Sequence, residues 1–233
     1  MIARRLNNLF HPKMGEVWML HRVVEQRSAD PNQRALEVTS DWLEQKIQDY
    51  KKKGFAFIAI DSITNRSSFT NLHTPFVCVT LDDGYRDNLT VALPLFHRLQ
   101  VPFCVYVTTG FIDNRQEMWW YPGQQLALSS DELRTLADHP LCTIGAHTVS
   151  HPHLDTLLKE EQQREIAESK QKLEALLSRP IDHFSYPHGA YNTDSLAICR
   201  EIGFHTAVTT NGRTVRTRYA PLQLDRINIV QPE

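Results

Sequence analysis

The sequence predicts an α/β fold whose mostly parallel sheet forms a distorted or incomplete (β/α) barrel. Apolar, strand-like runs alternate with helical patterns along the chain, which is the pattern of parallel β/α units. The seven or eight strand candidates, without a glycine-rich dinucleotide loop or P-loop, favour a barrel over an open doubly wound sheet. The polar motifs follow the carboxyl ends of strand candidates, where barrels build their active sites.

Eight apolar segments have the length and the β-branched or aromatic composition of buried strands. In chain order they are residues 17–24, 55–60, 76–81, 101–107, 142–146, 184–186, 207–209 and 224–230. The first segment is interrupted by His21 and Arg22, which make its carboxyl end polar. The third segment ends at Asp82 and Asp83, and the fifth ends at His147. We therefore expect these polar side chains on one rim of the barrel.

Five segments between the strands have the spacing of amphipathic helices. They are residues 40–53, 89–99, 131–138, a long helix within 155–177, and 193–202. Ser40 or Asp41 can cap the first helix, and Gly54 ends it. Pro94 kinks the second helix or restricts it to its last turns. Gly203 ends the last helix.

Length and composition fit a single domain of 233 residues, in which residues 1–14 form a lead-in arm. A net charge of −2 gives no electrostatic case for nucleic acid. No apolar run reaches the length of a membrane span, and the N-terminus lacks the apolar core of a secretory signal. If residue 1 is the natural start, we expect a cytoplasmic protein. The four cysteines lack metal or redox spacing and are expected to be buried, reduced thiols.

Two motifs offer ligands for a divalent metal. Asp82 and Asp83 follow a strand, and the turn at Gly84 must direct both toward one site, because adjacent side chains of a strand point to opposite sides. One carboxylate would bind a metal and the other would act as a general base; the alternative is a helix cap. His147 and His151 are four residues apart and can share a metal, although eleven histidines make chance spacings easy. The combination predicts a metal site.

Three segments carry a family resemblance. Residues 80–84 (TLDDG) match a motif T-F/L-D-D-G, and residues 147–154 (HTVSHPHL) match H-S/T-x-x-H-P-x-L in full. Residues 185–189 (SYPHG) match R-x-P-Y/F-G in part. With these motifs in this order, the chain resembles the polysaccharide deacetylases of carbohydrate esterase family 4, also called the NodB homology domain. The stretch from 76 to 210 fits the layout of that family.

The resemblance implies a metal-dependent deacetylase on a distorted (β/α) barrel, with an acetylated sugar or glycan as substrate. By position, Asp83, His147 and His151 bind the metal, and Asp82 is the general base. The backbone N–H of His188 helps to hold the oxyanion. Two imidazoles and one carboxylate suit Zn²⁺, with Co²⁺ or Ni²⁺ as alternatives, and leave open positions for water and substrate.

Two departures from the family pattern leave roles to be filled. The arginine of the third motif is Ser185 here, and no histidine follows His205 to serve as the late catalytic acid. His21 is the candidate acid, because its run resembles the Y-H-x-V opening of a family branch, including poly-N-acetylglucosamine deacetylases, whose acid histidine comes first. The alternative is a strand-end histidine bound to a loop carbonyl. Arg226, on the last strand candidate, is the candidate replacement for the arginine.

Further positions are expected to shape the site. Thr148 would support the two histidine ligands, and Pro187 would contact substrate beside the oxyanion donor. Trp119, Trp120 and Tyr121 suit stacking on sugar rings, or else form a hydrophobic cluster that anchors their loop. The predicted function is hydrolysis of an acetyl group, chiefly N-acetyl, from a sugar or glycan in surface-polysaccharide metabolism. The alternatives are an O-acetyl esterase and a non-catalytic glycan-binding protein that keeps the barrel.

Overall fold

The computed structural model describes residues 13–64, 74–216 and 219–233. The strands of its central sheet are β1 (Lys13–Leu20), β4 (Ala56–Phe57), β5 (Phe76–Leu81), β6 (Phe103–Val107), β7 (Cys142–Ala146), β8 (His183–Ser185), β9 (Thr206–Val208), β10 (Val215–Arg216) and β11 (Ile227–Asn228). Their order is β10-β1-β5-β6-β7-β8-β9, with β11 also paired to β1 and β4 to β5. All pairs are parallel except β1 with β10.

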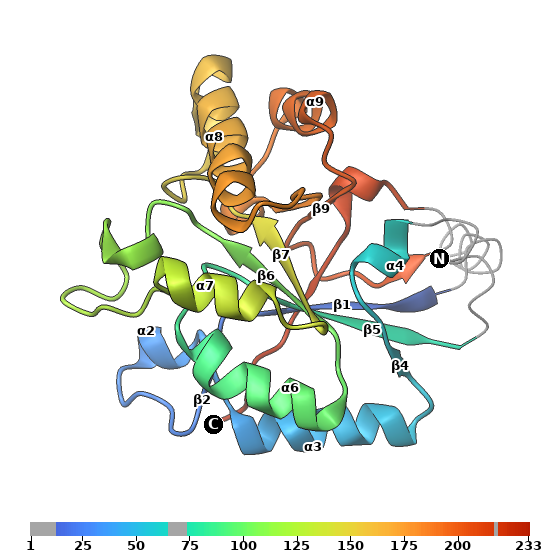
Figure 1. Ribbon diagram of the computed structural model, residues 1–233. Helices are drawn as coiled ribbons and strands as arrows, with labels where there is room; N and C mark the ends of the chain where they lie inside the picture. Colours follow the sequence, from blue (N-terminus) through green and yellow to red (C-terminus); the bar gives the residue numbers. More distant parts are fainter. Residues whose placement is uncertain (1–12, 65–73, 217–218) are drawn as a thin grey trace.

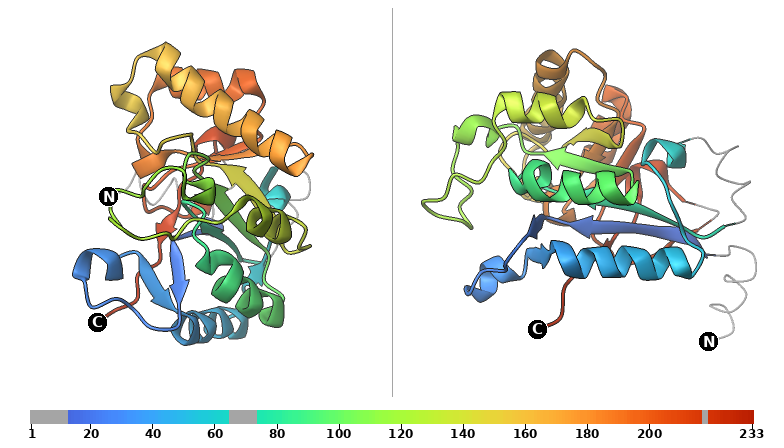
Figure 2. Two further views of the ribbon diagram at one scale, coloured as in Figure 1. Left: turned by 60° about the vertical axis from the view of Figure 1, so that its left-hand side comes forward. Right: turned by 60° about the horizontal axis from the view of Figure 1, so that its bottom comes forward.

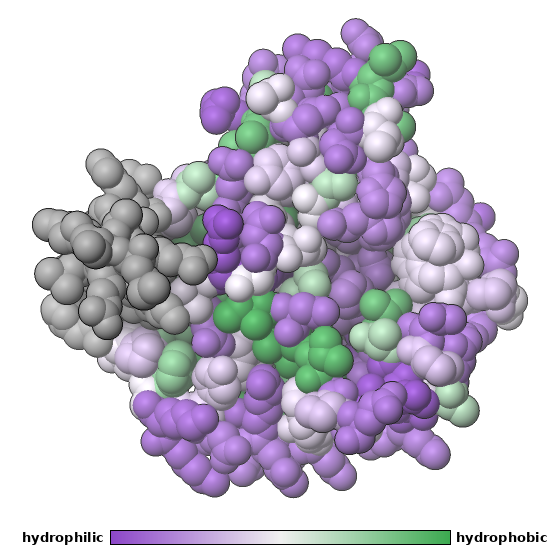
Figure 3. Space-filling model, turned by 180° about the vertical axis from the view of Figure 1, so that it is seen from behind, coloured by the Kyte–Doolittle hydropathy of each residue, from purple (hydrophilic) through white to green (hydrophobic). Residues whose placement is uncertain are grey.

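Helices cover the outside of the curled sheet (Figures 1 and 2). The longer ones are α3 (Ser40–Lys52), α6 (Leu93–Leu99), α7 (Ser130–Ala137), α8 (Lys159–Leu177) and α9 (Thr193–Ile202). In the view of Figure 1, α8 and α9 lie above the sheet, and α3 and α6 lie below it. None of the helices in the described ranges is long and apolar enough to cross a membrane. The face shown in Figure 3 is mostly hydrophilic, with small hydrophobic areas near its middle.

Residues 224–229 connect the two ends of the curled sheet. Leu224 forms a parallel bridge with Val208 of β9, and two residues of β11, beginning with Ile227, pair with Trp18 and Met19 of β1. The same short segment therefore touches the last and the first strand of the barrel. The sheet is thus a distorted (β/α) barrel, as predicted.

Alternate residues of β5 face two separate cores. Val77, Val79 and Leu81 belong to the cluster packed against the helices, whereas Phe76 and Cys78 belong to a cluster inside the barrel. All six residues of β5 are buried, which explains its continuous apolar sequence. The cysteines are free; three are buried, as expected, but Cys142 is partly exposed.

Several elements differ from the sequence prediction. The first predicted strand breaks at His21: β2 (Arg22–Val24) leaves the barrel and pairs with β3 (Glu37–Thr39) in a separate sheet. Residues 55–60 yield only the two-residue β4. Pro94 lies in the first turn of α6, directly after a π-helical turn, Asn88–Ala92. Two short helices, α2 (Pro31–Arg34) and α4 (Asp61–Thr64), and strand β10 were not predicted. Residues 1–12 of the predicted lead-in arm lie outside the described ranges.

Candidate active site

Asp83, His147 and His151 converge at the carboxyl ends of β5 and β7. Their ligand atoms all lie within 4.8 Å of one another. Asp83 Oδ1 is 3.5 Å from His147 Nε2 and 3.4 Å from His151 Nε2. This buried oxygen has no hydrogen-bond partner within the described ranges. An orphaned carboxylate oxygen between two imidazole nitrogens is the donor set that a divalent metal would satisfy, so the residues fit such an ion.

The backbone at two of these candidate ligands, and at the residue that follows the third, is held in an uncommon conformation. Asp83, Thr148 and His151 all have positive φ, at 74°, 65° and 63°. The Thr148 hydroxyl donates to the His147 carbonyl at 2.5 Å and accepts the His151 N–H at 3.1 Å. Thr148 therefore braces the loop between the two histidines. The sequence analysis did not single out Glu165 of α8. Its carboxylate accepts the backbone N–H groups of Val149 and Ser150, both at 2.9 Å.

The Nε2 atoms of both histidines face Asp83, and within the described part of the chain a hydrogen bond at the other ring nitrogen orients His147 but not His151. His147 Nδ1 lies 2.7 Å from the Ser185 carbonyl and so donates to it. Burial lowers the pKa of His151 to about 3, which keeps its ring neutral and able to bind a metal. Burial raises the pKa of Asp83, but the two histidines outweigh it and the net direction is downward.

The carboxylate of Asp82 is bound by a buried arginine. Arg226 donates from Nη1 to Asp82 Oδ1 at 2.7 Å and from Nη2 to Oδ2 at 2.6 Å, a bidentate pair. The guanidinium also donates to Thr80 Oγ1, to Ser185 Oγ at 3.0 Å and to the Thr209 carbonyl. Burial raises the pKa of Asp82, but Arg226 and then His147 outweigh it, so the carboxyl stays ionised. Arg226 thus contacts both Asp82 and Ser185, the residue at the position of the motif arginine; its role as the replacement stays a prediction.

His21 lies between β1 and β2, on the same rim as the aspartates. Its backbone is fixed to the segment after Asp82: the Leu20 carbonyl accepts the Asp82 N–H, and the His21 carbonyl accepts Asn88 Nδ2, both at 3.0 Å. The His21 side chain is one of the charges that lower the pKa of Asp82 and of Asp83. Its ring makes no hydrogen bond within the ranges described, unlike the expected alternative of a ring held by a loop carbonyl.

A buried ion network beneath His21 was not foreseen from the sequence. Arg22 binds Asp87 at 2.7 Å and Glu37 at 2.8 Å, and it lies over the rings of Tyr85 and Tyr121. Burial raises the pKa of Asp87 to about 6 against the pull of Arg22. This network joins β2, β3 and the segment after β5, so it fixes the rim on which His21 lies.

The aromatic triplet divides into separate roles. Trp119 is 69% exposed and free to contact a ligand. Trp120 is half-buried, donates Nε1–H to the Tyr85 hydroxyl at 2.6 Å and lies 5.0 Å from the His151 ring, between ring centres. Tyr121 has no exposed surface, and its hydroxyl donates to the Gln33 carbonyl. The expectation that Tyr121 stacks on a sugar is wrong; it anchors the loop.

Residues Pro187–Gly189 form a short 3₁₀ turn beside the candidate metal ligands. His188 has φ 58°, and its ring stacks on His153 at 3.9 Å and lies 4.4 Å from the His151 ring. The backbone of His188 is therefore held at the edge of the site. Pro187 is buried, so it shapes the turn and is not placed for a substrate contact, contrary to its predicted role.

Comparisons with known proteins point to one family. Residues 70–207 match the family model described as polysaccharide deacetylase. The chain is 26% identical over 153 residues, 66% of its length, to "Putative polysaccharide deacetylase YxkH" of Bacillus subtilis (strain 168), of which it spans about half, 51%.

Solved structures show the same architecture. Deacetylase PplD of Streptococcus pyogenes, in complex with acetate, superposes with a TM-score of 0.78 at 25% identity, covering 92% of each chain. IcaB of Ammonifex degensii has the same fold, with a TM-score of 0.80 at 20% identity over 94% of this chain and 92% of its own. With the motif geometry and a family match over more than half of its length, this chain belongs to the polysaccharide deacetylase family.

Proposed function

We propose that the protein is a metal-dependent hydrolase that removes an N-acetyl group from a sugar of a surface glycan. The observation that carries the proposal is the unpartnered Asp83 oxygen between His147 and His151, beside an Asp82 carboxylate fixed by Arg226. These three ligands would hold Zn²⁺, with Co²⁺ or Ni²⁺ as alternatives. When bound, such an ion supplies Lewis acidity at the acyl carbonyl and acidifies water.

The chain's own residues account for the proton transfers. Asp82, held as a carboxylate, takes the proton of the water that adds to the acyl carbon. The His188 N–H at the edge of the site donates to the developing oxyanion. His21, on the same rim, gives a proton to the nitrogen as the C–N bond breaks. Acetate and a free amine on the sugar are the products.

An O-acetyl ester is the second candidate substrate. The observation in its favour is that no histidine follows His205, because an alkoxide leaves with less help from an acid than an amine does. The position of His21, directly after the Leu20 carbonyl that accepts the Asp82 N–H, favours the amide. A non-catalytic glycan-binding protein would have no use for an intact pairing of Asp82 and Arg226 beside the three ligands.

Acetate release from N-acetylated and O-acetylated sugars and glycans, with metals added back to stripped protein, tests the proposal. We expect Asp82→Asn to keep stoichiometric metal but to lose roughly 10²–10⁴ in turnover. Asp83→Asn and His147→Ala should lose both the turnover and the metal. Asp155→Asn, an exposed aspartate outside the site, is the control and should change neither.

Two results would overturn this assignment. Metal loss in Asp82→Asn with full occupancy in Asp83→Asn would reverse the two roles. Glycan binding without acetate release from any substrate, at full metal occupancy, would leave only the binding-protein alternative.

A further inference from the structure

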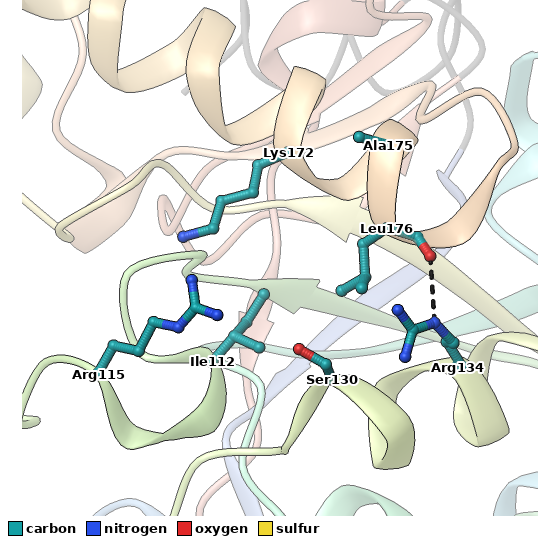
Figure 4. Close-up of a pocket in the computed structure, with 7 residues that line it drawn as sticks. All are labelled: Ile112, Arg115, Ser130, Arg134, Lys172, Ala175 and Leu176. Carbon is teal, nitrogen blue, oxygen red and sulfur yellow. Dashed lines mark hydrogen bonds between the residues drawn. The ribbon is translucent and has the colours of Figure 1, made fainter.

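A cavity of about 320 Å³ lies between the start of α7, the second half of α8 and the turn at residues 112–115 (Figure 4). We call it the α7–α8 cavity; its lining residues are Ile112, Arg115, Ser130, Arg134, Lys172, Ala175 and Leu176. None of these residues belongs to the candidate active site. Its volume is at the lower end of the range for small-molecule sites.

Lys172 and Arg115 bring two positive charges to one side of this cavity. Figure 4 shows their head groups turned toward each other, and Arg115 is one of the charges that lower the pKa of Lys172, after burial. The Lys172 ammonium donates to the Thr109 carbonyl at 2.7 Å, which uses one of its three N–H groups. No carboxylate within the described ranges forms an ion pair with Lys172.

Nearby acids neutralise the cavity only in part. Asp113 accepts two hydrogen bonds from Ser130, at 2.6 and 2.7 Å, and reaches Arg115 only at 3.5 Å. Asp131 pairs with Arg134 at 2.6 Å, but its own side chain is 94% exposed. The three cations are Lys172, Arg115 and Arg134, and the two carboxylates are Asp113 and Asp131. Among the described residues, one positive charge is therefore left without a carboxylate partner. Hydrogen bonds to backbone carbonyls do not account for this excess charge, because Lys172 makes only one such bond within the described ranges, to Thr109.

Three of the remaining lining residues are apolar, and the other two, Ser130 and Arg134, are polar. Ile112 is buried, and Figure 4 shows the Leu176 side chain of α8 turned toward it. Ala175 is the third apolar residue of the lining. A ligand that fits both sides has one negative charge and an apolar C–H face. A pyranose ring that carries a carboxylate has both properties, whereas a free phosphate has no apolar face.

We propose that the α7–α8 cavity binds an acidic sugar unit, with its carboxylate between Lys172 and Arg115. The cavity borders the active site through Thr109, because the Thr109 N–H donates to the Thr148 carbonyl at 3.1 Å in the loop between His147 and His151. That this sugar is a unit of the glycan being deacetylated rests on the proposed function.

Titration with glucuronate, glucose and inorganic phosphate, followed by NMR of backbone amides, tests the cavity without any need for catalysis. We expect saturable glucuronate shifts in residues 112–115 and 172–176, and none with glucose. Lys172→Met should weaken glucuronate binding at least tenfold, whereas Lys172→Arg should retain it. Lys159→Met, an exposed lysine at the other end of α8, is the matched control.

The outcomes separate the possible errors. Arg115→Gln, at an exposed position, repeats the test if Lys172→Met unfolds, and it should also lose tenfold. Glucuronate binding unchanged in both variants would overturn the site. Phosphate binding as tight as glucuronate, with the same shifts, would overturn the sugar assignment in favour of an adventitious ion only.

Catalysis adds an independent readout. Lys172→Met should raise KM for an N-acetylated oligosaccharide with uronic acid units at least tenfold relative to a neutral one, and an unchanged ratio would overturn the subsite. If neither substrate releases acetate from wild-type protein, the proposed function fails, while the glucuronate titration still decides the cavity.

Discussion

Arg226 holds the carboxylate of Asp82 from a position 144 residues later in the chain. Both groups are buried, and the planar guanidinium makes two parallel bonds that a lysine cannot reproduce. We expect Arg226→Met to lower the free energy of unfolding by about 3–5 kcal/mol, because it leaves an uncompensated buried charge. Urea unfolding measures this loss.

A second variant keeps this prediction specific to the ion pair. The double variant Asp82→Asn/Arg226→Met removes both charges and should recover part of the loss. The loss of unfolding free energy in the double variant is compared with the sum of the losses in Asp82→Asn and Arg226→Met. If the two are equal, the charges do not stabilise each other.

His21 is the residue whose role depends most on the type of leaving group. We expect His21→Ala to lower turnover on an N-acetyl substrate by roughly 10²-fold or more, because an amine must be protonated as it leaves. The loss on an activated acetyl ester should be small. Equal losses on the two substrates, measured as kcat at full metal occupancy, would contradict the assignment of His21 as the acid.

The candidate metal ligands were predictable from the sequence because they lie in two short segments, each attached to a single strand end. Asp82 and Asp83 end β5, and His147 and His151 follow β7. The contact between Asp82 and Arg226 was only a candidate, because it depends on how residues 224–229 close the barrel. No local pattern near Arg226 reveals that closure.

At the scale of elements, the continuous apolar runs 76–81 and 142–146 are strands with the predicted bounds. The failures were short segments whose pairing partners decide their structure: β3 and β10, and the break at His21. There, tertiary contacts such as the Arg22–Asp87 pair outweigh local composition.

The loop at residues 110–129 can be tested through two of its aromatic residues. Trp119→Ala should weaken glycan binding by about 1 kcal/mol, roughly fivefold in KM, because an exposed ring is lost. Its melting temperature should not change. Tyr121→Ala should instead destabilise the protein by about 3 kcal/mol, because it empties a buried site. Destabilisation by Trp119→Ala, or none by Tyr121→Ala, would contradict this division of roles.

At the scale of the whole molecule, α4 is fastened to the amino ends of the barrel strands by Asp61. Its carboxylate lies 3.0 Å from His183 Nε2 and accepts the Thr143 hydroxyl at 3.0 Å. The hydrogen bond from His183 is the main cause that lowers the pKa of Asp61. A carboxyl whose folded pKa lies below its unfolded value stabilises the fold above the unfolded value, about 3.9, and loses this contribution as the pH falls further.

We therefore expect wild-type protein to lose more unfolding free energy between pH 7 and pH 3 than Asp61→Asn does. The difference should be small, because the Asp61 side chain is 61% exposed and solvent screens the interaction. Urea unfolding at the two pH values measures it, with Asp155→Asn as an exposed control. If the unfolding free energies of wild type and Asp61→Asn change identically with pH, the Asp61 carboxylate does not stabilise the fold through its ionisation.

The closure of the barrel by residues 224–229 has a consequence for the timing of activity during synthesis. A nascent chain acquires Asp83, His147 and His151 well before Arg226 leaves the ribosome. Until that segment docks between β9 and β1, the Asp82 carboxylate lacks its partner and the rim that carries His21 is open on one side. If the proposed function holds, a partly made chain would have the candidate metal ligands but not the fixed Asp82 carboxylate. Hydrolysis would then begin only after the chain has been translated through β11.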